Sequence, residues 1–222
     1  MDVTELRVAL EAVAKPEDVP QMTAYMKDHF AFLGVRSPAA RAAAKPFIAA
    51  ARDADAGELV RFADDCWAQP EREFQYVGCI VLRRWIKTLH AENLVDLERL
   101  VTTKSWWDTV DSLAAWSVGP LVLTNRELVS VMDRWIGDNN IWLARTAILH
   151  QLSYKADTDE DRLFGYAEQR AEDTEFFIRK AIGWALRQHA RLRPDEVRSF
   201  VTANEDRLSG LTKREALKHL DR

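Results

Sequence analysis

The chain has few cysteines and no long apolar run, which are the features of disulfide-bonded and membrane-spanning proteins. Only two of its 222 residues are cysteines, Cys66 and Cys79, so no disulfide framework can form and a reducing cytoplasm is the expected setting. The first five residues include two acidic side chains, Asp2 and Glu5, and contain no apolar signal core. The most apolar run, Leu113 to Leu123, is too short to span a bilayer and contains a Gly-Pro pair. We therefore expect no membrane partner.

Motifs of several enzyme classes are also missing. The sequence has no Gly-rich phosphate loop and no nucleophilic-serine motif. Its five histidines show no metal-ligand spacing, so we expect neither a metal nor a cofactor. The net charge is −4, which argues weakly against a nucleic-acid partner, so any such binding needs a local basic face.

Charge is nonetheless distributed unevenly along the chain. Residues 83–87 and 179–193 are locally basic, whereas residues 157–175 are strongly acidic. An array with basic inner helices and acidic outer helices would bind a phosphate backbone despite the negative total. The simpler interpretation, which is the better one for any single Lys or Arg, is a solvated side chain with a helical partner.

Helical periodicity is what the sequence has in abundance. No alternating strand pattern and no Asn-Gly hairpin interrupts it, and the loops are short enough to predict antiparallel neighbours. No linker or low-complexity segment divides the chain, so we predict a single domain, 1–222. The predicted helices cover residues 3–14, 22–32, 39–52, 57–68, 72–89, 93–101, 105–118, 124–136, 141–153, 159–171, 174–190, 195–203 and 212–220.

A loose internal repeat indicates how these helices are organised. Long apolar helices that each follow a more acidic one begin near Gln75, Trp107, Trp142 and Phe177, about every 32–35 residues. Two helices per unit at this period predict an α-solenoid of HEAT-like helical hairpins, with every second helix lining a concave groove. A generic helical bundle with accidental spacing is the alternative.

Tryptophans pair with charged residues at helical spacing. Trp107 with Asp111, Trp142 with Arg145, and Trp184 with Arg187 lie three or four residues apart. Three consecutive repeats would bring these pairs onto one wall of the groove. A carboxylate beside an indole face suits a positively charged ligand or transition state. For most other tryptophans, filling the space between helices is the better interpretation.

The run from Lys104 to Asp111 combines two adjacent tryptophans with two carboxylates. Ser105 and Asp108 fit a capping box, which gives Asp108 a structural role. Asp111 has no such role, and its place near a helix N-terminus would favour the ionised form. Capping boxes are also predicted at Thr124 with Glu127 and at Thr212 with Glu215.

The run Thr103-Lys104-Ser105-Trp106-Trp107-Asp108-Thr109-Val110-Asp111 resembles the AlkD-like DNA alkylation repair enzymes. Further matching stretches follow that family's order over nearly the whole chain. They are Tyr25 to Lys27, His29-Phe30, Phe32 to Val35, Glu73 to Tyr76, Trp142 to Leu152, and Phe177 to Arg187.

This resemblance implies a HEAT-like repeat glycosylase that removes N3- and N7-alkylated purines from duplex DNA and leaves the base stacked. It implies that the acidic residue Asp111 is catalytic and that Trp107 and Trp184 hold the deoxyribose. It further implies a monomer without cofactor, associated with the nucleoid when bound to DNA. A non-catalytic HEAT scaffold for DNA or protein is the alternative function. The residues predicted to contact DNA are Arg145, Arg187, Tyr25, Arg36, Lys104 and Trp142.

Overall fold

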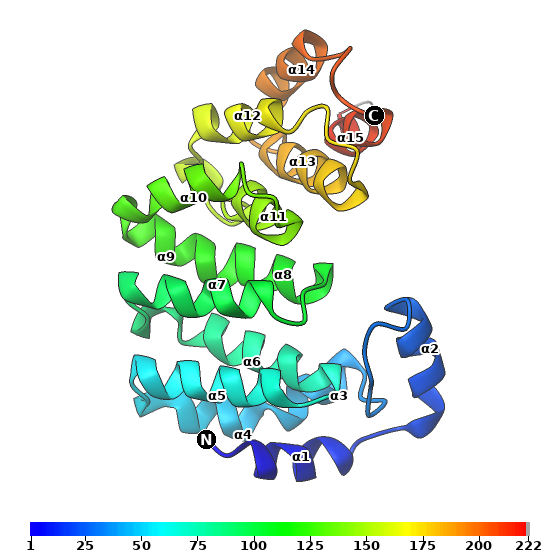
Figure 1. Ribbon diagram of the computed structural model, residues 1–222, viewed down its shortest axis with the longest axis vertical. Helices are drawn as coiled ribbons and strands as arrows, with labels where there is room; N and C mark the ends of the chain where they lie inside the picture. The colour runs from blue at the N-terminus through cyan, green and yellow to red at the C-terminus, as the bar shows by residue number, and fades with distance from the viewer. Residues whose placement is uncertain (221–222) are drawn as a thin grey trace. The chain divides into compact units, whose positions relative to one another are not determined.

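The computed structural model describes residues 1–220, and over this range the chain is all-α (Figure 1). Helices and short 3₁₀ turns follow one another, and the described range contains no strand, only an isolated parallel bridge between Ala31 and Glu71. The predicted all-α class is therefore confirmed. The residues group into two compact units, Met1–Asp96 and Leu97–Arg222, which are described in turn. The single domain stays a prediction.

The first unit packs its helices around α6. This helix contacts α3, α4 and α5, and its buried side chains include Phe74 and Leu82. The unit contains α1 (Val3–Glu11), η1 (Pro16–Asp18), α2 (Val19–Tyr25), α3 (Ser37–Ala43), α4 (Lys45–Ala50), η2 (Ala51–Asp53), α5 (Ala56–Ala68), α6 (Arg72–Arg84), η3 (Ile86–Thr88) and η4 (Ala91–Asn93).

The prediction of a helix over residues 22–32 was wrong in its second half. The helix α2 ends at Tyr25, and Lys27 and Asp28 both adopt positive φ, which a helix cannot continue. The loop that follows is held by Glu73, a carboxylate with no solvent exposure. It accepts hydrogen bonds of 3.0–3.1 Å from the backbone N–H groups of residues 33–35. Within the predicted range, the Ala31 carbonyl accepts from the N–H of Arg72 at 2.9 Å, so tertiary hydrogen bonding replaces the helix here.

The second unit continues the succession of helices to the end of the described chain. Its first helix, α7 (Leu94–Thr102), begins in the first unit. The others are α8 (Trp107–Leu113), the π-helical turn η5 (Ala114–Val118), α9 (Gly119–Thr124), η6 (Arg126–Leu128), α10 (Val129–Trp135), α11 (Ile141–Leu149), η7 (Lys155–Asp157), α12 (Glu160–Gln169), α13 (Phe176–His189), α14 (Pro194–Ala203) and α15 (Gly210–Leu217).

A π-helical turn connects α8 to α9 and follows directly after the segment that carries Asp111. Pro120 has no N–H to donate to the preceding turn, and Gly119 approaches the backbone of α11 very closely. A Cβ atom at Gly119 would lie 2.1 Å from the carbonyl oxygen of His150. The absence of a side chain at Gly119 therefore sets how closely the two helices pack.

The helices α11, α13 and α15 pack in succession. Helix α13 contacts both α11 and α15, as Figure 1 shows. At Gly183 an added Cβ would lie 2.5 Å from the Cβ of Glu215, so α15 lies directly against α13. No helix among residues 1–220 is long and apolar enough to cross a bilayer.

Candidate functional site

A largely buried ion pair joins two helices of the second unit. The Arg145 guanidinium, on α11, donates from Nε to Oδ1 of Asp111 at 2.6 Å and from Nη2 to Oδ2 at 2.7 Å. Asp111 lies on α8, 34 residues earlier in the chain. Two parallel bonds of this kind fix the plane of the carboxylate as well as its position. The repeat therefore does bring Asp111 and Arg145 together, as the sequence predicted.

Both members of this pair are largely removed from solvent. The Asp111 side chain is 13% exposed and the Arg145 side chain 4% exposed. Arg145 also donates from Nη1 to the backbone carbonyl of Phe177, so it is held from two helices. Burial raises the pKa of the Asp111 carboxyl above its ordinary value, and the Arg145 guanidinium opposes that effect. The guanidinium thus stabilises the charged form of a carboxylate that burial makes more basic.

The helix start in front of Asp111 differs from the predicted capping box. Helix α8 begins at Trp107, and Trp106 occupies the N-cap position without a side-chain cap. The Ser105 hydroxyl instead donates to the carbonyl of Val101 at 2.7 Å. Asp111 is therefore the fifth residue of α8, beyond the first turn, where a helix dipole has little effect on the charge. Arg145, rather than the helix N-terminus, is the cation that favours ionised Asp111.

Other predicted capping boxes were also wrong. The Thr124 hydroxyl donates to the carbonyls of Pro120 and Leu121, because Thr124 ends α9. Ser209 caps α15 by accepting from the Thr212 N–H, which places Thr212 inside the helix.

An aromatic cluster packs beside the ion pair. Phe177 lies at the start of α13 with its ring centroid 5.0 Å from both Trp106 and Trp142, and those two indoles lie 5.8 Å apart. The Arg145 guanidinium carbon lies 5.9 Å from the centroid of the Phe177 ring. Phe176, 52% exposed, contacts Phe177 edge-on at 5.4 Å. The cluster shields one side of the pair from water and leaves an apolar ring at its rim.

The two tryptophans predicted to hold the sugar lie on helices that carry this site. Trp107 precedes Asp111 by four residues on α8, so both point to one side of that helix. Trp184 follows Phe177 by seven residues on α13, which is about two turns and returns to the same face. Both indoles are half-buried. Their contact with a deoxyribose stays a prediction.

Arg187 is engaged by a carboxylate of α15. Its Nη1 lies 2.5 Å from Oε2 of Glu215, and Lys180 donates to the other oxygen at 2.6 Å. The two cations hold the pKa of Glu215 below its ordinary value, with the Lys180 hydrogen bond as the largest cause. Arg187 thus faces α15. Its contact with DNA stays a prediction. A phosphate would have to compete with Glu215.

The remaining predicted DNA contacts lie outside the cluster. Lys104 precedes α8 in the second unit and has a φ of +49°. In the first unit, Tyr25 is 66% exposed at the end of α2. Arg36 precedes α3, and its guanidinium donates to Asp18 at 2.8 and 2.6 Å. None of these arrangements tests the predicted contacts.

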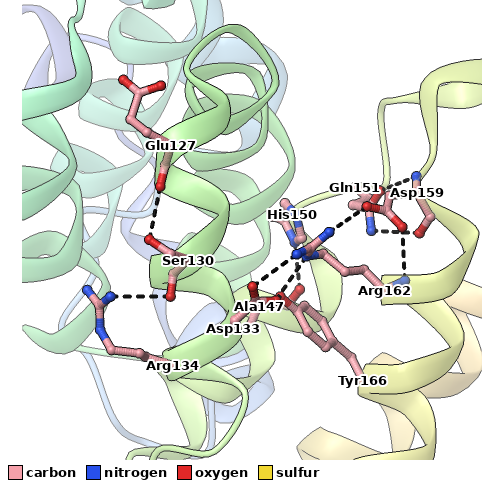
Figure 2. Close-up of polar contacts among 10 residues, drawn as sticks. All are labelled: Glu127, Ser130, Asp133, Arg134, Ala147, His150, Gln151, Asp159, Arg162 and Tyr166. Atoms are coloured by element: carbon pink, nitrogen blue, oxygen red, sulfur yellow. Dashed lines mark hydrogen bonds and ion pairs between the residues drawn. The ribbon is translucent and has the colours of Figure 1, made fainter.

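A second Asp–Arg pair joins α10 to α12 (Figure 2). Arg162 donates from Nε and Nη2 to the two carboxylate oxygens of Asp133 at 2.9 and 3.0 Å. The Tyr166 hydroxyl donates to the same carboxylate at 2.6 Å, and Arg162 also binds Asp159 at 2.7 Å. These bonds tie α12 to α10.

No group of three or more His, Cys, Asp and Glu side chains in the described range could hold a metal ion.

Sequence reasoning missed two contributors to the cluster. The sequence places Phe177 at the start of a repeat and Trp106 and Phe177 in stretches that resemble the family, but it predicts no role for either side chain. A signal existed for Phe177, because it occupies the same place in its repeat as Trp107 and Trp142 do in theirs. The bond from Arg145 to the Phe177 carbonyl had no signal, since backbone acceptors carry no residue identity.

The chain is similar in sequence and fold to proteins of known structure. It is similar to a protein of Enterococcus faecalis described as a predicted DNA alkylation repair enzyme, with 30% identity and a TM-score of 0.86 over 94% of this chain and 97% of that one. AlkD2 of Streptococcus mutans shares the fold at 16% identity and a TM-score of 0.64, over 92% of this chain and 100% of AlkD2.

The protein smu.31 of Streptococcus mutans UA159 also shares the fold, at 15% identity and a TM-score of 0.62, over 79% of this chain and 90% of its own. No curated protein sequence matches this chain. The model of the family described as DNA alkylation repair enzyme matches residues 6–220. The helical-repeat fold and the match over nearly the whole chain show that this protein belongs to the DNA alkylation repair enzyme family.

Proposed function

We propose that this protein is a DNA glycosylase that hydrolyses the N-glycosidic bond of N3- and N7-alkylated purines in duplex DNA. The observation that carries the proposal is the Asp111 carboxylate, 13% exposed and held in a fixed plane by Arg145 beside an aromatic cluster. A carboxylate in this setting suits a reaction in which positive charge develops on a sugar. Family membership supports the broader role in repair of alkylated DNA.

The substrate supplies its own leaving group. Alkylation at N3 or N7 places a positive charge on the purine, which weakens the bond between its nitrogen and C1′ of the deoxyribose. The departing base then needs no protonation, so the site needs no general acid. What it needs is a negative charge for the oxocarbenium-like sugar and a base for the attacking water.

Asp111 can perform both tasks. A carboxylate has about four lone-pair positions, and the two bonds from Arg145 leave others for a water molecule. As the C1′–N bond breaks, the water oxygen bonds to C1′ and its proton passes to Asp111. Because burial raises the pKa of Asp111, this carboxylate accepts a proton more readily than an exposed aspartate. The products are the free base and an abasic sugar.

Arg145 is then a positioning residue. It holds the carboxylate plane and is itself held by the Phe177 carbonyl. With 4% of its side chain exposed, a direct phosphate bond would require it to leave Asp111. We therefore assign its main effect to Asp111 and propose no contact of its own with the DNA.

The indoles of Trp107 and Trp184 would pack against the deoxyribose. An indole face stabilises nearby positive charge by about 1–2 kcal/mol when water is excluded. Recognition through the sugar needs no extrahelical pocket for the base, so the lesion can remain stacked. Selection would then follow the weakness of the glycosidic bond, and bulky N7 adducts would be accepted.

The test is release of free base from a duplex with one N7-methylguanine at a defined position. We expect the protein to liberate 7-methylguanine, and 3-methyladenine from methylated DNA, in the presence of EDTA and without cofactor. Each released base would be identified by chromatography, and an unmethylated duplex would serve as the control. Duplex binding without any base release would contradict the proposal and favour a non-catalytic DNA-binding scaffold.

A further inference from the structure

A cavity of about 240 Å³ lies within the second unit, among α11, α12 and α13. Its walls come from the C-terminal part of α11, the segment after it, α12, and the last turns of α13. On α11 the lining residues follow Arg145, and on α13 they follow Trp184. Neither Asp111 nor any member of the aromatic cluster lines it. The cavity is therefore separate from the proposed catalytic site.

The walls of the cavity are mainly apolar. Ile148, Leu163 and Ala185 line it and are at most 5% exposed, and Leu152 and Leu192 add further aliphatic surface. A dry cavity of about 150 Å³ is large enough for benzene. A volume of about 240 Å³ is therefore large enough for a body the size of two fused rings.

The charged side chains that line the cavity all carry positive charge. Lys155 and Arg191 are exposed cations at its edge, and no Asp or Glu lines it. Neither cation forms an ion pair within the described part of the chain. Arg193, two residues beyond Arg191, does pair with Glu160 at 3.2 Å. Lys155 also holds a φ of +57°, an uncommon conformation for a residue with a side chain.

A buried histidine adds a second observation that points to a ligand. His189 lines the cavity with 4% of its side chain exposed, and its Nδ1 has no hydrogen-bond partner in the part of the chain that the structure describes. Its Nε2 lies 3.2 Å from Glu160 without a well-formed hydrogen bond. Buried ring nitrogens are normally paired, so a polar group at this wall would satisfy a need that the protein leaves open.

We propose that this cavity binds a small organic anion with a flat apolar body. The aliphatic walls would take the body, and Lys155 and Arg191 would bind the carboxylate or other anionic group at the edge. His189 would hydrogen-bond to a polar atom of the ligand. This site does not depend on the proposed glycosylase activity, because its lining residues are not those of the reaction.

The test uses naphthoate, a bicyclic carboxylate, and its neutral amide, naphthamide. Binding to the full chain would be followed by backbone amide chemical shifts and by calorimetry. We expect naphthoate to shift the amide signals of residues around the cavity and to bind about fivefold more tightly than naphthamide, which is the factor that one partly exposed ion pair can supply.

Substitutions then separate the cavity from general surface binding. The variant Lys155→Gln with Arg191→Gln should bring naphthoate down to the affinity of naphthamide. Arg193→Gln, the matched control, removes a nearby cation that does not line the cavity and should change nothing. Ala185→Leu fills the cavity and should abolish binding of both compounds. A thermal unfolding curve would confirm that it remains folded.

The proposal would be overturned if the protein bound naphthoate and naphthamide with equal affinity. It would also be overturned if Arg193→Gln weakened naphthoate binding as much as the Lys155→Gln, Arg191→Gln variant does, or if the amide shifts lay outside the cavity. Displacement of naphthoate by unmodified duplex DNA would also overturn it, because the cavity would then belong to the DNA-binding surface. Base release by the Lys155→Gln, Arg191→Gln variant should match wild type, so failure of either proposal leaves the other testable.

Discussion

The second unit contains two bidentate Asp–Arg pairs with the same bonding pattern and opposite consequences. In each, Nε and Nη2 of an arginine bind the two oxygens of one aspartate. Asp111 and Arg145 are 13% and 4% exposed, whereas Asp133 and Arg162 are 43% and 35% exposed. The pKa of Asp111 is raised, and the pKa of Asp133 is lowered by the hydrogen bond from Arg162.

The difference shows that burial, rather than the arginine, decides what each carboxylate can do. Solvent around Asp133 keeps the cost of its charge low, so Arg162 and Tyr166 turn it into a stable acceptor that joins two helices. Around Asp111 the loss of hydration outweighs the guanidinium. Asp133 is therefore suited to a structural role, and Asp111 to accepting a proton.

Removing the arginine of each pair should separate the two roles most strongly. Arg145→Gln leaves a buried carboxylate without its cation, which we expect to cost about 3 kcal/mol of unfolding free energy and to abolish most base release. Arg162→Gln should cost about 1 kcal/mol, because its pair is partly solvated, and should leave base release near wild type.

Thermal unfolding and single-turnover base release measure both effects on the same samples. For a domain of this size, the Arg145 variant should melt about 6–12 °C below wild type and the Arg162 variant about 2–4 °C below it. Equal losses of stability in the two variants would mean that the difference in burial has no energetic consequence. Loss of base release in Arg162→Gln but not in Arg145→Gln would contradict the assignment of catalysis to the Asp111–Arg145 pair.

The two carboxylates should respond to pH in opposite ways. A raised pKa means that folded Asp111 binds its proton more tightly than unfolded Asp111, so its contribution to stability falls as pH rises above the ordinary value of 3.8. A lowered pKa means that Asp133 contributes stability above pH 3.8 and loses it as pH falls through its folded pKa.

Base release should therefore decline in acid with an apparent pKa above 3.8, as Asp111 becomes protonated. The measurement is a pH profile of enzymatic release, with spontaneous loss of base subtracted at each pH. Asp108→Asn should move this acid limb to lower pH, because the charge of Asp108 contributes to raising the pKa of Asp111. If the apparent pKa of the acid limb is the same in Asp108→Asn as in wild type, the assignment of this limb to Asp111 is contradicted.

The smallest expected effect concerns Arg187. Because Arg187 already pairs with Glu215, Arg187→Gln should weaken binding to undamaged duplex only severalfold and lower the slope of log affinity against log salt by at most about one. Arg134→Gln, which removes a cation that donates to the carbonyl of Ser130, is a matched control. An unchanged salt slope in Arg187→Gln would remove Arg187 from the DNA-binding surface.

Much of the fold was predictable because helical periodicity and repeat spacing are local patterns. The same spacing correctly brought Asp111 to Arg145, since equivalent positions in stacked repeats become neighbours. The failures were long-range. Within the range where periodicity predicted a helix, the Ala31 carbonyl instead accepts from the N–H of Arg72, and Glu215 turns Arg187 towards α15. The degree of burial that raises the pKa of Asp111 also depends on three packed helices, which no single segment encodes.

The most direct test of the account is base release by Asp111→Asn compared with Asp133→Asn under single-turnover conditions. We predict that Asp111→Asn slows release of 7-methylguanine at least about tenfold, or about 1.4 kcal/mol in the barrier, while it still binds the duplex. Asp133→Asn should release base at the wild-type rate and lose only stability. If Asp111→Asn is folded, binds DNA and works as fast as wild type, Asp111 is not the catalytic carboxylate.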